Sequence, residues 1–586
     1  MRHAMPAPGP GQSSHPTPSA IVLSMNETAD QTPNGNHIRS GFLDGIVLGC
    51  AAIGLVLMRY AAFDVPLEAD ECNYAIIGQR LLDGGRLYVD AWDHQPPAIF
   101  AIYAAVIAVL GDSAAAFRSA AIGASLVSLV AIYCLCRKLA GRWPATWAAL
   151  MFAMVSSDPG TAGEGCNREI YMNVFVLLAW WLAAIAVPPD RPARRPTTSP
   201  HPERNDQAKT ENAESAFNPR LVFAAGTALG IGSTIKTVLA AHWVFLALWI
   251  VIDVARATAS WKKSATSLLL LAAGPAFVWI LTCTYFAATG RLSLFIDAAF
   301  YFNLSYSEAD TNTLSRFFHF FSPERHPFVF RSALPLWLAA LPAALLLLAA
   351  SWKKHRMTIP ALAMLAGSYV AVCLPGRAWP HYYYLMIPAM TITVACSFHL
   401  LETLVTLNDR LRVCVAVAAI ALALATGRTE WNRYLSQPPY GITVARYNSR
   451  DFWAKGIGEK VASVTEPQDR IFVYGNDPGI YYYADRRCAS RYTMVTGLRD
   501  GHSGVAQRRE ILMRELLEDP PRMILMETGE PVFEAMTRLL ESHYGMAIGV
   551  DRHDKKGTLI LAVFANKLEP VRMIDWDWDR SEVGGW

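Results

Sequence analysis

Long apolar runs are the feature that most constrains what this chain can fold into. A helix needs about 20 apolar residues to cross the hydrocarbon core of a bilayer, and about eleven runs in the sequence approach that length. Charged residues make up only 17% of the chain, whereas roughly a quarter is usual in soluble domains. The sequence therefore predicts an α-helical polytopic membrane protein. The runs expected to span the membrane are Phe42–Phe63, Ala115–Cys136, Trp143–Ser157, Ile170–Val187, Leu221–Ile235, Val238–Val254, Ala265–Ala287, Ser332–Ala350, Thr358–Leu374, Tyr384–Leu401 and Val413–Thr426.

One further apolar run, Pro97–Leu110, is too short to span. As a helix it would extend about 21 Å, less than the hydrocarbon core of ~30 Å. We predict that it lies at the membrane surface or dips into it. The positive charges agree, because an inside N-terminus then places the Lys- and Arg-rich loops on the cytoplasmic side, as the positive-inside rule requires. These loops contain Arg137–Arg142, Arg191–Arg195, Arg256–Lys263, Lys353–Arg356 and Arg410–Arg412.

This topology divides the chain into three parts. Residues 1–41 are rich in Pro, Ser and Gly and are predicted to form a disordered cytoplasmic tail. Residues 42–426 form the membrane domain, whose Pro-rich segment 188–219 is predicted to be a disordered cytoplasmic loop. Residues 427–586 are expected to be extracytoplasmic, and their alternating strand-like and helical patterns predict a small α/β domain. The strand-like runs are Arg470–Tyr474, Met523–Met526 and Thr558–Phe564, and the helical patterns include Arg508–Leu517 and Val532–Ser542.

Neither the net charge nor the cysteines indicate a partner. The formal net charge of +3 gives no argument for binding nucleic acid. Most of the 10 cysteines lie in apolar runs, where a thiol behaves as a small hydrophobe, and no Cys/His spacing typical of a metal site is present. Cys72 and Cys166 flank charged motifs, and whether they form a disulfide in an oxidising compartment stays open.

The first extracytoplasmic loop carries two adjacent carboxylates, Asp70 and Glu71. They open a predicted amphipathic helix within the stretch LEADECNYAIIGQRLLDGGRLYVDAWDHQPP, which runs from Leu67 to Pro97. At a membrane surface such a pair can act as general base and orienting group for an incoming hydroxyl, or it can hold a divalent cation. The same pattern is equally typical of a solvated helix start, where acidic residues suit the helix dipole.

Further motifs with the same outward placement follow along the chain. His94-Gln-Pro-Pro precedes an apolar helix, GDSAAAFR ends at Arg118, NREIYMNVF contains Glu169, and RAWPHYYY begins at Arg377. In this order the motifs resemble the protein O-mannosyltransferase and aminoarabinose transferase group, which are membrane glycosyltransferases of the C superfamily. The resemblance extends over about residues 42–425 and is densest in the first 180 residues.

The resemblance implies a sugar donor carried on a polyprenyl phosphate. The acceptor hydroxyl attacks the anomeric carbon, and the lipid phosphate leaves with inversion. The resemblance also implies that Asp70 is the base, that Glu71 is its orienting partner, and that Glu169 contacts the sugar or the acceptor. The alternative for Glu169 is an interfacial carboxylate paired with Arg168.

The leaving phosphate needs cations, and Lys236, Arg377 and His381 are the candidates, with Tyr382 beside them. Lys236 lies between two apolar runs, where a cation is costly unless it has a partner. Its alternative is a side chain that snorkels to the headgroups. Arg377 and His381 stand among Trp379 and three tyrosines, a pattern that also suits an aromatic belt bound to ordinary lipid phosphates.

Arg118 and His94 match functional positions of the mannosyltransferases, and Asp93 is a weaker candidate of the same kind. The alternatives are that Arg118 only flanks a span and that the Pro-Pro pair after His94 only starts a helix. The loop Asn303–His319 and the segment Tyr474–Arg487 are expected to roof the site, with no catalytic role assigned to either.

Together these features predict a glycosyltransferase on the outer face of a bacterial-type plasma membrane, in contact with membrane lipids. The luminal carbohydrate-binding repeats of the mannosyltransferases have no counterpart, so the acceptor stays open between glycan, lipid and protein. A divalent cation held by Asp70 and Glu71 is the one cofactor left open. A transporter or flippase is the main alternative, but the spans are largely free of midplane charges and no internal repeat is evident. The other alternative is a non-catalytic subunit of an envelope glycan assembly.

Overall fold

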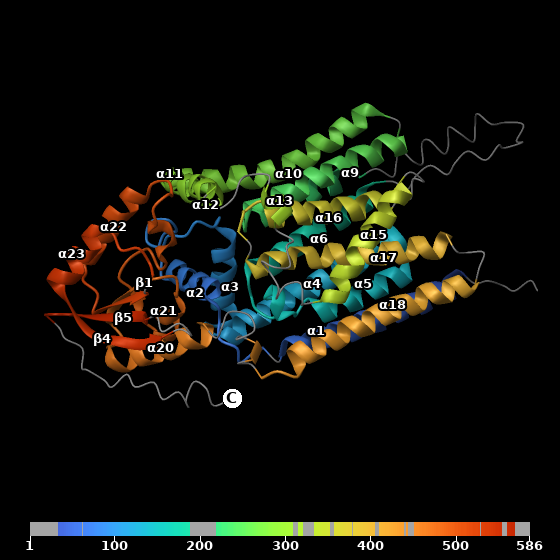
Figure 1. Ribbon diagram of the computed structural model, residues 1–586. Helices are drawn as coiled ribbons and strands as arrows, with labels where there is room; N and C mark the ends of the chain where they lie inside the picture. Colours follow the sequence, from blue (N-terminus) through green and yellow to red (C-terminus); the bar gives the residue numbers. More distant parts are fainter. Residues whose placement is uncertain are drawn as a thin grey trace, which may run out of the picture. The chain divides into compact units, whose positions relative to one another are not determined.

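The computed structural model describes most of the chain (Figure 1). By its contacts the chain forms two units, Met1–Ile46 and Val47–Trp586, and the first is described only for the beginning of helix α1 (Pro33–Tyr60). Residues 1–32 and 188–217 lie outside the described part and belong to the predicted disordered segments 1–41 and 188–219. The described helices begin inside these two segments, at Pro33 and Pro219. The described residues are 33–60, 62–187, 218–258, 260–308, 315–319, 333–351, 357–377, 379–404, 409–438, 441–442, 450–527, 529–553 and 559–568.

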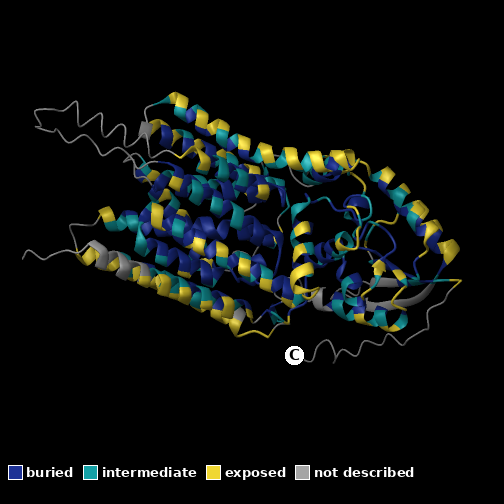
Figure 2. Cartoon of the chain, turned by 180° about the vertical axis from the view of Figure 1, so that it is seen from behind, coloured by how far each residue is buried: buried dark blue, intermediate teal, exposed yellow. Residues whose placement is uncertain are grey.

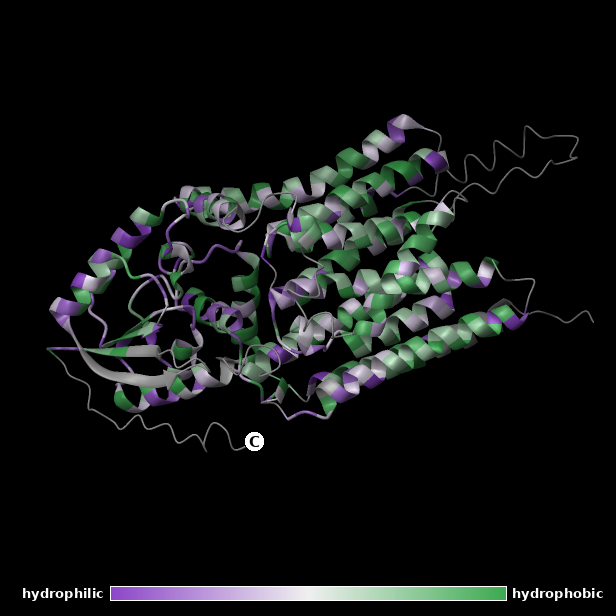
Figure 3. Ribbon diagram, in the orientation of Figure 1, coloured by the Kyte–Doolittle hydropathy of each residue, from purple (hydrophilic) through white to green (hydrophobic). Residues whose placement is uncertain are grey.

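Each predicted apolar run forms a helix, which confirms the predicted helical membrane fold. In the described part of the chain, six helices are long and apolar enough to cross a membrane, and the larger number of spans stays a prediction. Figure 3 shows that apolar residues dominate these helices. Besides α1, the helices are α4 (Ala114–Ala140), α5 (Arg142–Val155), α6 (Arg168–Ala186), α8 (Pro219–Ser233), α9 (Ala240–Thr258), α10 (Trp261–Ala288), α15 (Leu334–Ala350), α16 (Thr358–Cys373), α17 (Met386–Leu404) and α18 (Asp409–Glu430).

The helices differ in how much of their surface is covered by protein. Helix α17 is almost wholly buried, whereas α10 and α18 are mostly exposed (Figure 2). The exposed side chains of α10 and α18 are large and apolar, for example Leu269, Ile280 and Leu424. Such surfaces are unfavourable in water and favourable against lipid tails, so α10 and α18 are suited to face the bilayer.

Helices α8 and α10 approach each other closely because glycines lie at their contact. A Cβ atom on Gly274 would lie 2.3 Å from the backbone nitrogen of Thr227, and one on Gly226 would lie 2.3 Å from the carbonyl oxygen of Leu271. Small residues permit such contacts between membrane helices, where packing rather than the hydrophobic effect drives association. This pair therefore fixes one side of the bundle.

Two short helices carry the first extracytoplasmic motifs. Helix α2 (Ala69–Leu82) contains the two adjacent acids, and α3 (Ala98–Leu110) is the apolar run that is too short to span. Helix α3 has 13 residues, which corresponds to about 20 Å of length. The two helices pack against each other, and Gly78 of α2 allows the approach because a Cβ there would lie 2.9 Å from the backbone of Ala104.

The C-terminal part contains a five-stranded sheet, as the sequence predicts in outline. The strand order is β2-β1-β3-β5-β4, with β2, β1 and β3 parallel and β5 and β4 antiparallel additions. The predicted strands correspond to β1, β3 and β5, whereas β2 and β4 were not expected. The elements are α20 (Arg450–Val464), β1 (Arg470–Tyr474), α21 (Gly479–Ala484), β2 (Arg487–Cys488), α22 (Val505–Glu518), β3 (Met523–Glu527), α23 (Glu534–His543), β4 (Tyr544–His553) and β5 (Leu559–Asn566).

The α/β part docks on helix α2 and on the residues just before it through polar contacts. The Arg80 guanidinium donates to the carbonyl oxygen of Cys488 at 2.9 Å, and the backbone N–H of Leu67 donates to the Tyr483 hydroxyl at 2.7 Å. Both contacts join residues more than 400 positions apart in the chain. The sheet is therefore held next to the helix that begins with the two acids.

We expect Gly274→Ala to destabilise the protein, because its methyl group has no room at the contact of α8 and α10. The cost expected for overpacking is about 1–3 kcal/mol. Gly123→Ala on helix α4 is the matched control, since nothing lies within 4 Å of a Cβ at that position. Thermal unfolding of both variants in detergent measures the difference, and equal midpoints would contradict the packing argument.

Candidate active site

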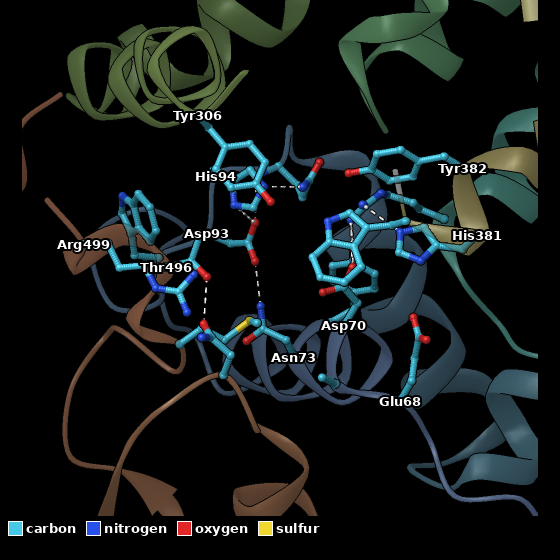
Figure 4. Close-up of a pocket in the computed structure, with 18 of the residues that line it drawn as sticks. Glu68, Asp70, Asn73, Asp93, His94, Tyr306, His381, Tyr382, Thr496 and Arg499 are labelled. Carbon is cyan, nitrogen blue, oxygen red and sulfur yellow. Dashed lines mark hydrogen bonds and ion pairs between the residues drawn. The ribbon is translucent and has the colours of Figure 1, made fainter. Parts of the chain in front are cut away.

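A polar cavity of about 290 Å³ lies where the membrane helices meet the α/β part (Figure 4). Its walls come from α2, the loop before α3, the first turn of α6, the short helix Pro380–Leu385, helix α12 (Asn303–Glu308) and the loops of the α/β part. The lining residues are Glu68, Ala69, Asp70, Asn73, Tyr74, Trp92, Asp93, His94, Gln95, Arg168, Tyr306, Trp379, His381, Tyr382, Asn476, Met494, Thr496, Arg499, Glu527 and Glu530.

The two adjacent acids of α2 point in different directions, because successive residues of a helix are about 100° apart. Asp70 lines the cavity, and its side chain is 30% exposed. Glu71 is fully buried and does not line the cavity. One Glu71 oxygen accepts the backbone N–H of Glu68 at 3.0 Å, and the other accepts that of Cys166 at 2.6 Å. Glu71 therefore caps α2 and ties it to the segment that leads into α6.

Next to Asp70 lies a row of buried charges of alternating sign. Arg168 Nη1 lies 3.3 Å from Asp70 Oδ2, and Arg168 Nε lies 3.2 Å from Glu169 Oε1. The same Glu169 oxygen is 3.2 Å from Lys236 Nζ. Burying charges is costly unless each is paired and hydrogen-bonded. Each charge of this row has a partner of opposite sign, whereas Glu169 Oε2 is buried without a hydrogen-bond partner among the described residues. The pairing of Glu169 with Arg168, the alternative considered for this acid, is present.

Tyr382 lies between the two cations of this row. Lys236 Nζ is 3.2 Å from the centre of the Tyr382 ring, and Arg168 Cζ is 5.8 Å from it. Both distances are within the range of cation–π attraction. His381 Nε2 lies 3.5 Å from Arg168 Nη2, so the histidine also faces this cluster. Lys236 and Glu169 do not line the cavity but contact the residues that do.

Asp93 and His94 occupy another wall of the cavity. Asn73 donates its amide to Asp93 Oδ2 at 2.6 Å, and the backbone N–H of Gln95 donates to Asp93 Oδ1 at 2.8 Å. The His94 ring packs against Phe302. Burial raises the pKa of Asp93 to about 7 and lowers the pKa of His94 to about 3. His94 is therefore neutral at pH 7, and its 3.5 Å contact with Asp93 is not an ion pair.

Arg118 and Arg377, two further predicted site residues, also lie outside the cavity lining. Arg118 is buried and donates to the carbonyl oxygens of Glu164 at 3.1 Å and Val65 at 2.8 Å, so it holds the backbone of two loops. Arg377 lies over the ring of Tyr306, with Cζ 4.5 Å from the ring centre. Tyr306 itself lines the cavity. The contacts of Arg118 are structural, and those of Arg377 place it behind a wall residue.

The α/β part contributes a wall of the cavity that the sequence predicts only in part. Asn476 lies in the segment expected to roof the site, and Tyr306 lies in the other expected roof segment. Thr496, Arg499 and Glu530 were not expected. The only signal available for them was their position after strands of a parallel sheet, and one of those strands, β2, has 2 residues and leaves no pattern in the sequence.

The residues present do not fit a divalent cation held between the two adjacent acids. Both Glu71 oxygens accept backbone N–H groups, and Asp70 faces the Arg168 guanidinium. Within the described ranges, no group of three or more His, Cys, Asp or Glu side chains is placed to hold a metal ion. Cys72 and Cys166 are both buried, and the described structure contains no disulfide between them.

Comparison with known proteins agrees with the geometry. Residues 94–194 match the family model of dolichyl-phosphate-mannose-protein mannosyltransferases. No protein of curated function matches the sequence. Among solved structures, the fold is similar to that of ArnT from Cupriavidus metallidurans bound to undecaprenyl phosphate, with a TM-score of 0.55, 15% identity, and coverage of 90% of this chain and 98% of that chain.

A second solved structure with some similarity is the Archaeoglobus fulgidus oligosaccharyltransferase tethered with an acceptor peptide. Its TM-score is 0.47, its identity is 12%, and the match covers 92% of this chain and 74% of that chain. The family match and the fold shared with ArnT confirm the resemblance to membrane glycosyltransferases of the C superfamily that the motifs indicate.

We expect Glu71→Ala to destabilise the protein by about 2–5 kcal/mol, because two buried N–H groups lose a charged acceptor. The control is Glu534→Ala, which removes an exposed glutamate from the first turn of α23 and should change stability by less than about 0.5 kcal/mol. Thermal unfolding in detergent measures both. If the Glu71→Ala protein were as stable as the control, the two hydrogen bonds would not contribute to the stability of the fold.

The raised pKa of Asp93 predicts a pH dependence of stability. The folded chain holds a proton on Asp93 up to a pKa of about 7, whereas the unfolded chain releases it near pH ~4. The contribution of Asp93 to stability therefore falls as the pH rises from about 4 to about 7. Asp93→Asn has no ionisable group there and should flatten the slope of unfolding temperature against pH. Identical slopes in the two proteins would contradict the raised pKa.

Proposed function

We propose that this chain transfers a sugar from a polyprenyl-phosphate donor to an acceptor hydroxyl on the outer face of the membrane. The proposal rests on the position of Asp70. Its carboxylate is partly exposed in a cavity lined by polar side chains and lies 3.3 Å from the Arg168 guanidinium. The undecaprenyl phosphate bound to the structurally similar ArnT supports the class of donor. The positive-inside distribution of Lys and Arg supports the outer side.

Asp70 is the base of the proposed reaction. An acceptor hydroxyl in the cavity gives its proton to the Asp70 carboxylate while its oxygen attacks the anomeric carbon of the donor sugar. The bond between that carbon and the lipid phosphate breaks, and the phosphate leaves with the bonding electrons. Attack from the side opposite to the phosphate inverts the anomeric centre.

Arg168 couples the proton transfer to the departure of the phosphate. Before the reaction its guanidinium faces the Asp70 carboxylate. When Asp70 takes up the proton its negative charge disappears, and the same charge develops on the leaving phosphate. A cation that exchanges one partner for the other is stabilising in the transition state, where electrostatic preorganisation counts most. His381 Nε2 lies 3.5 Å from Arg168 Nη2. A guanidinium only donates hydrogen bonds, so His381 accepts from Arg168 and helps to hold it in place.

Lys236 and Glu169 keep this cation in place. Together with Asp70 and Arg168 they form a row of two carboxylates and two cationic side chains, which has no net formal charge before substrate enters. We assign Glu169 the role of holding the Arg168 guanidinium and Lys236 the role of balancing Glu169. Glu71, with both oxygens bound to backbone N–H groups, orients helix α2 rather than the acceptor.

We expect Asp70→Asn to lose about 10²–10⁴-fold in transfer rate, because an amide cannot take the proton. The matched control is Asp83→Asn at the other end of α2, which lies outside the cavity lining and pairs with Arg487. In cells that lack the native gene, the Asp70 variant should accumulate the lipid-linked donor and lose one surface glycan. If the Asp70→Asn protein folds normally and the cells keep the glycan, the result would favour the alternative that this chain is a non-catalytic subunit.

A further inference from the structure

The parallel strands of the α/β part end at the cavity. Strands β2, β1 and β3 run parallel, with β1 in the middle. The chain passes from β1 to β2 on one side and then crosses to β3 on the other side, so its direction of winding reverses between β1 and β3. In open parallel sheets, ligands bind outside the carboxyl ends of the strands at such a reversal.

Residues that follow each of these strands line the cavity. Asn476 is the second residue after β1, Glu527 is the last residue of β3, and Glu530 follows shortly after it. Thr496 and Arg499 come from the loop region after β2. Figure 4 shows Thr496 and Arg499 on one side of the cavity, with Asp70 and His381 on the opposite side. We name Asn476, Thr496, Arg499, Glu527 and Glu530 the sheet wall.

Hydrogen bonds hold the sheet wall in one arrangement. The Asn476 amide donates to Glu530 Oε1 at 3.0 Å and accepts from the Thr496 hydroxyl at 2.8 Å. The backbone N–H of Asn476 donates to Glu527 Oε2 at 2.8 Å, and Arg499 Nε donates to Glu530 Oε2 at 3.0 Å. A preorganised set of this kind loses little freedom when a ligand binds.

A glycine permits the closest of these approaches. A Cβ on Gly475 would lie 2.6 Å from Glu527 Oε2 and 2.8 Å from the Glu527 Cβ. The turn after β1 can therefore lie against the end of β3 only while position 475 has no side chain. Gly475 therefore allows the carboxyl ends of β1 and β3 to come together at the cavity.

The charge of the sheet wall limits what it can bind. It contains two carboxylates and one guanidinium, and Arg499 directs both Nε and Nη2 to Glu530. Its formal charge is therefore −1, with an excess of hydrogen-bond acceptors. Such a surface suits hydroxyl groups, which donate hydrogen bonds, and repels phosphate and carboxylate groups. The proposed transfer chemistry on the opposite side of the cavity uses none of these residues.

We propose that the sheet wall is a subsite for the acceptor, and that it takes a sugar with free hydroxyl groups and no acidic group. This inference rests on the proposed transferase function, because it assigns the acceptor to the wall that faces Asp70. The wall binds sugar hydroxyls remote from the reacting one and so holds that hydroxyl toward Asp70. The donor phosphate stays on the side of Arg168.

Two probes that differ in charge test the subsite on the full chain in lipid nanodiscs. Saturation-transfer NMR compares methyl α-glucoside, which is neutral, with methyl α-glucuronide, which carries a carboxylate. We expect the glucoside to bind at least about tenfold more tightly, since the glucuronide places an anion against the acidic wall. Equal binding of the two probes, or no binding of either, would overturn the proposal.

Variants assign the binding to the wall. Asn476→Ala should weaken glucoside binding about tenfold, the loss expected for a hydrogen-bonding group in a charged network. Glu527→Gln together with Glu530→Gln should narrow the preference between the two probes. Glu534→Gln on the exposed start of α23 is the matched control and should leave both affinities unchanged. If the wall variants bind both probes as the wild type does, the subsite is elsewhere and the proposal fails.

Asp70→Asn separates this inference from the proposed function. We expect that variant to lose transfer while it still prefers the glucoside. If Asp70→Asn loses transfer but the wall variants bind both probes as the wild type does, the proposed subsite is wrong and the proposed transferase function stands. An Asp70→Asn protein that keeps full transfer would remove the proposed catalytic role, whereas the probe preference would still report on the wall.

Discussion

The buried Glu71 carboxylate joins the start of α2 to Cys166, which lies 95 residues further along the chain than Glu71, and the geometry of the site depends on this link. It accepts the N–H of Glu68 at the start of α2 and the N–H of Cys166 just before α6. The neighbouring residues on both sides then face each other, so that Asp70 lies beside Arg168. A buried carboxylate is costly unless hydrogen-bonded, and two backbone donors supply that condition. One acid of the pair thus builds the site and leaves the other exposed to the cavity.

The row of alternating charges explains how so polar a cluster can persist at the end of membrane helices. Asp70, Arg168, Glu169 and Lys236 balance one another without any ligand. Proton uptake by Asp70 breaks this balance and leaves one positive charge in excess, at the moment when a leaving phosphate would gain a negative one. The sheet wall on the other side carries a net negative charge. During the reaction the cavity therefore has a positive side at Arg168 and a negative side at the sheet wall. This arrangement suits a reaction between an anionic lipid carrier and a neutral acceptor.

Much of the fold could be predicted from the sequence, because apolar runs and strand patterns are local signals. Strand β2, with 2 residues, and strand β4 were missed, since neither has a pattern that stands out from its neighbours. The adjacent acids drew attention to Asp70, but the different direction of Glu71 depends on a backbone N–H far along the chain. Arg168 was considered only as the partner of Glu169, and its contact with Asp70 requires the link through Glu71. The sheet wall, including Arg499, exists only because three parallel strands end together.

In the proposed reaction the lipid phosphate and the acceptor meet in the cavity beside the Asp70–Arg168 pair. The most direct test is a cryo-EM structure of the full chain in nanodiscs that contain undecaprenyl phosphate. We expect phosphate density within hydrogen-bond distance of Arg168, on the membrane side of the cavity, with the carboxylate of Asp70 facing the open space beside it. Phosphate density bound only outside this cavity, with the cavity left unoccupied, would contradict the proposed site of transfer.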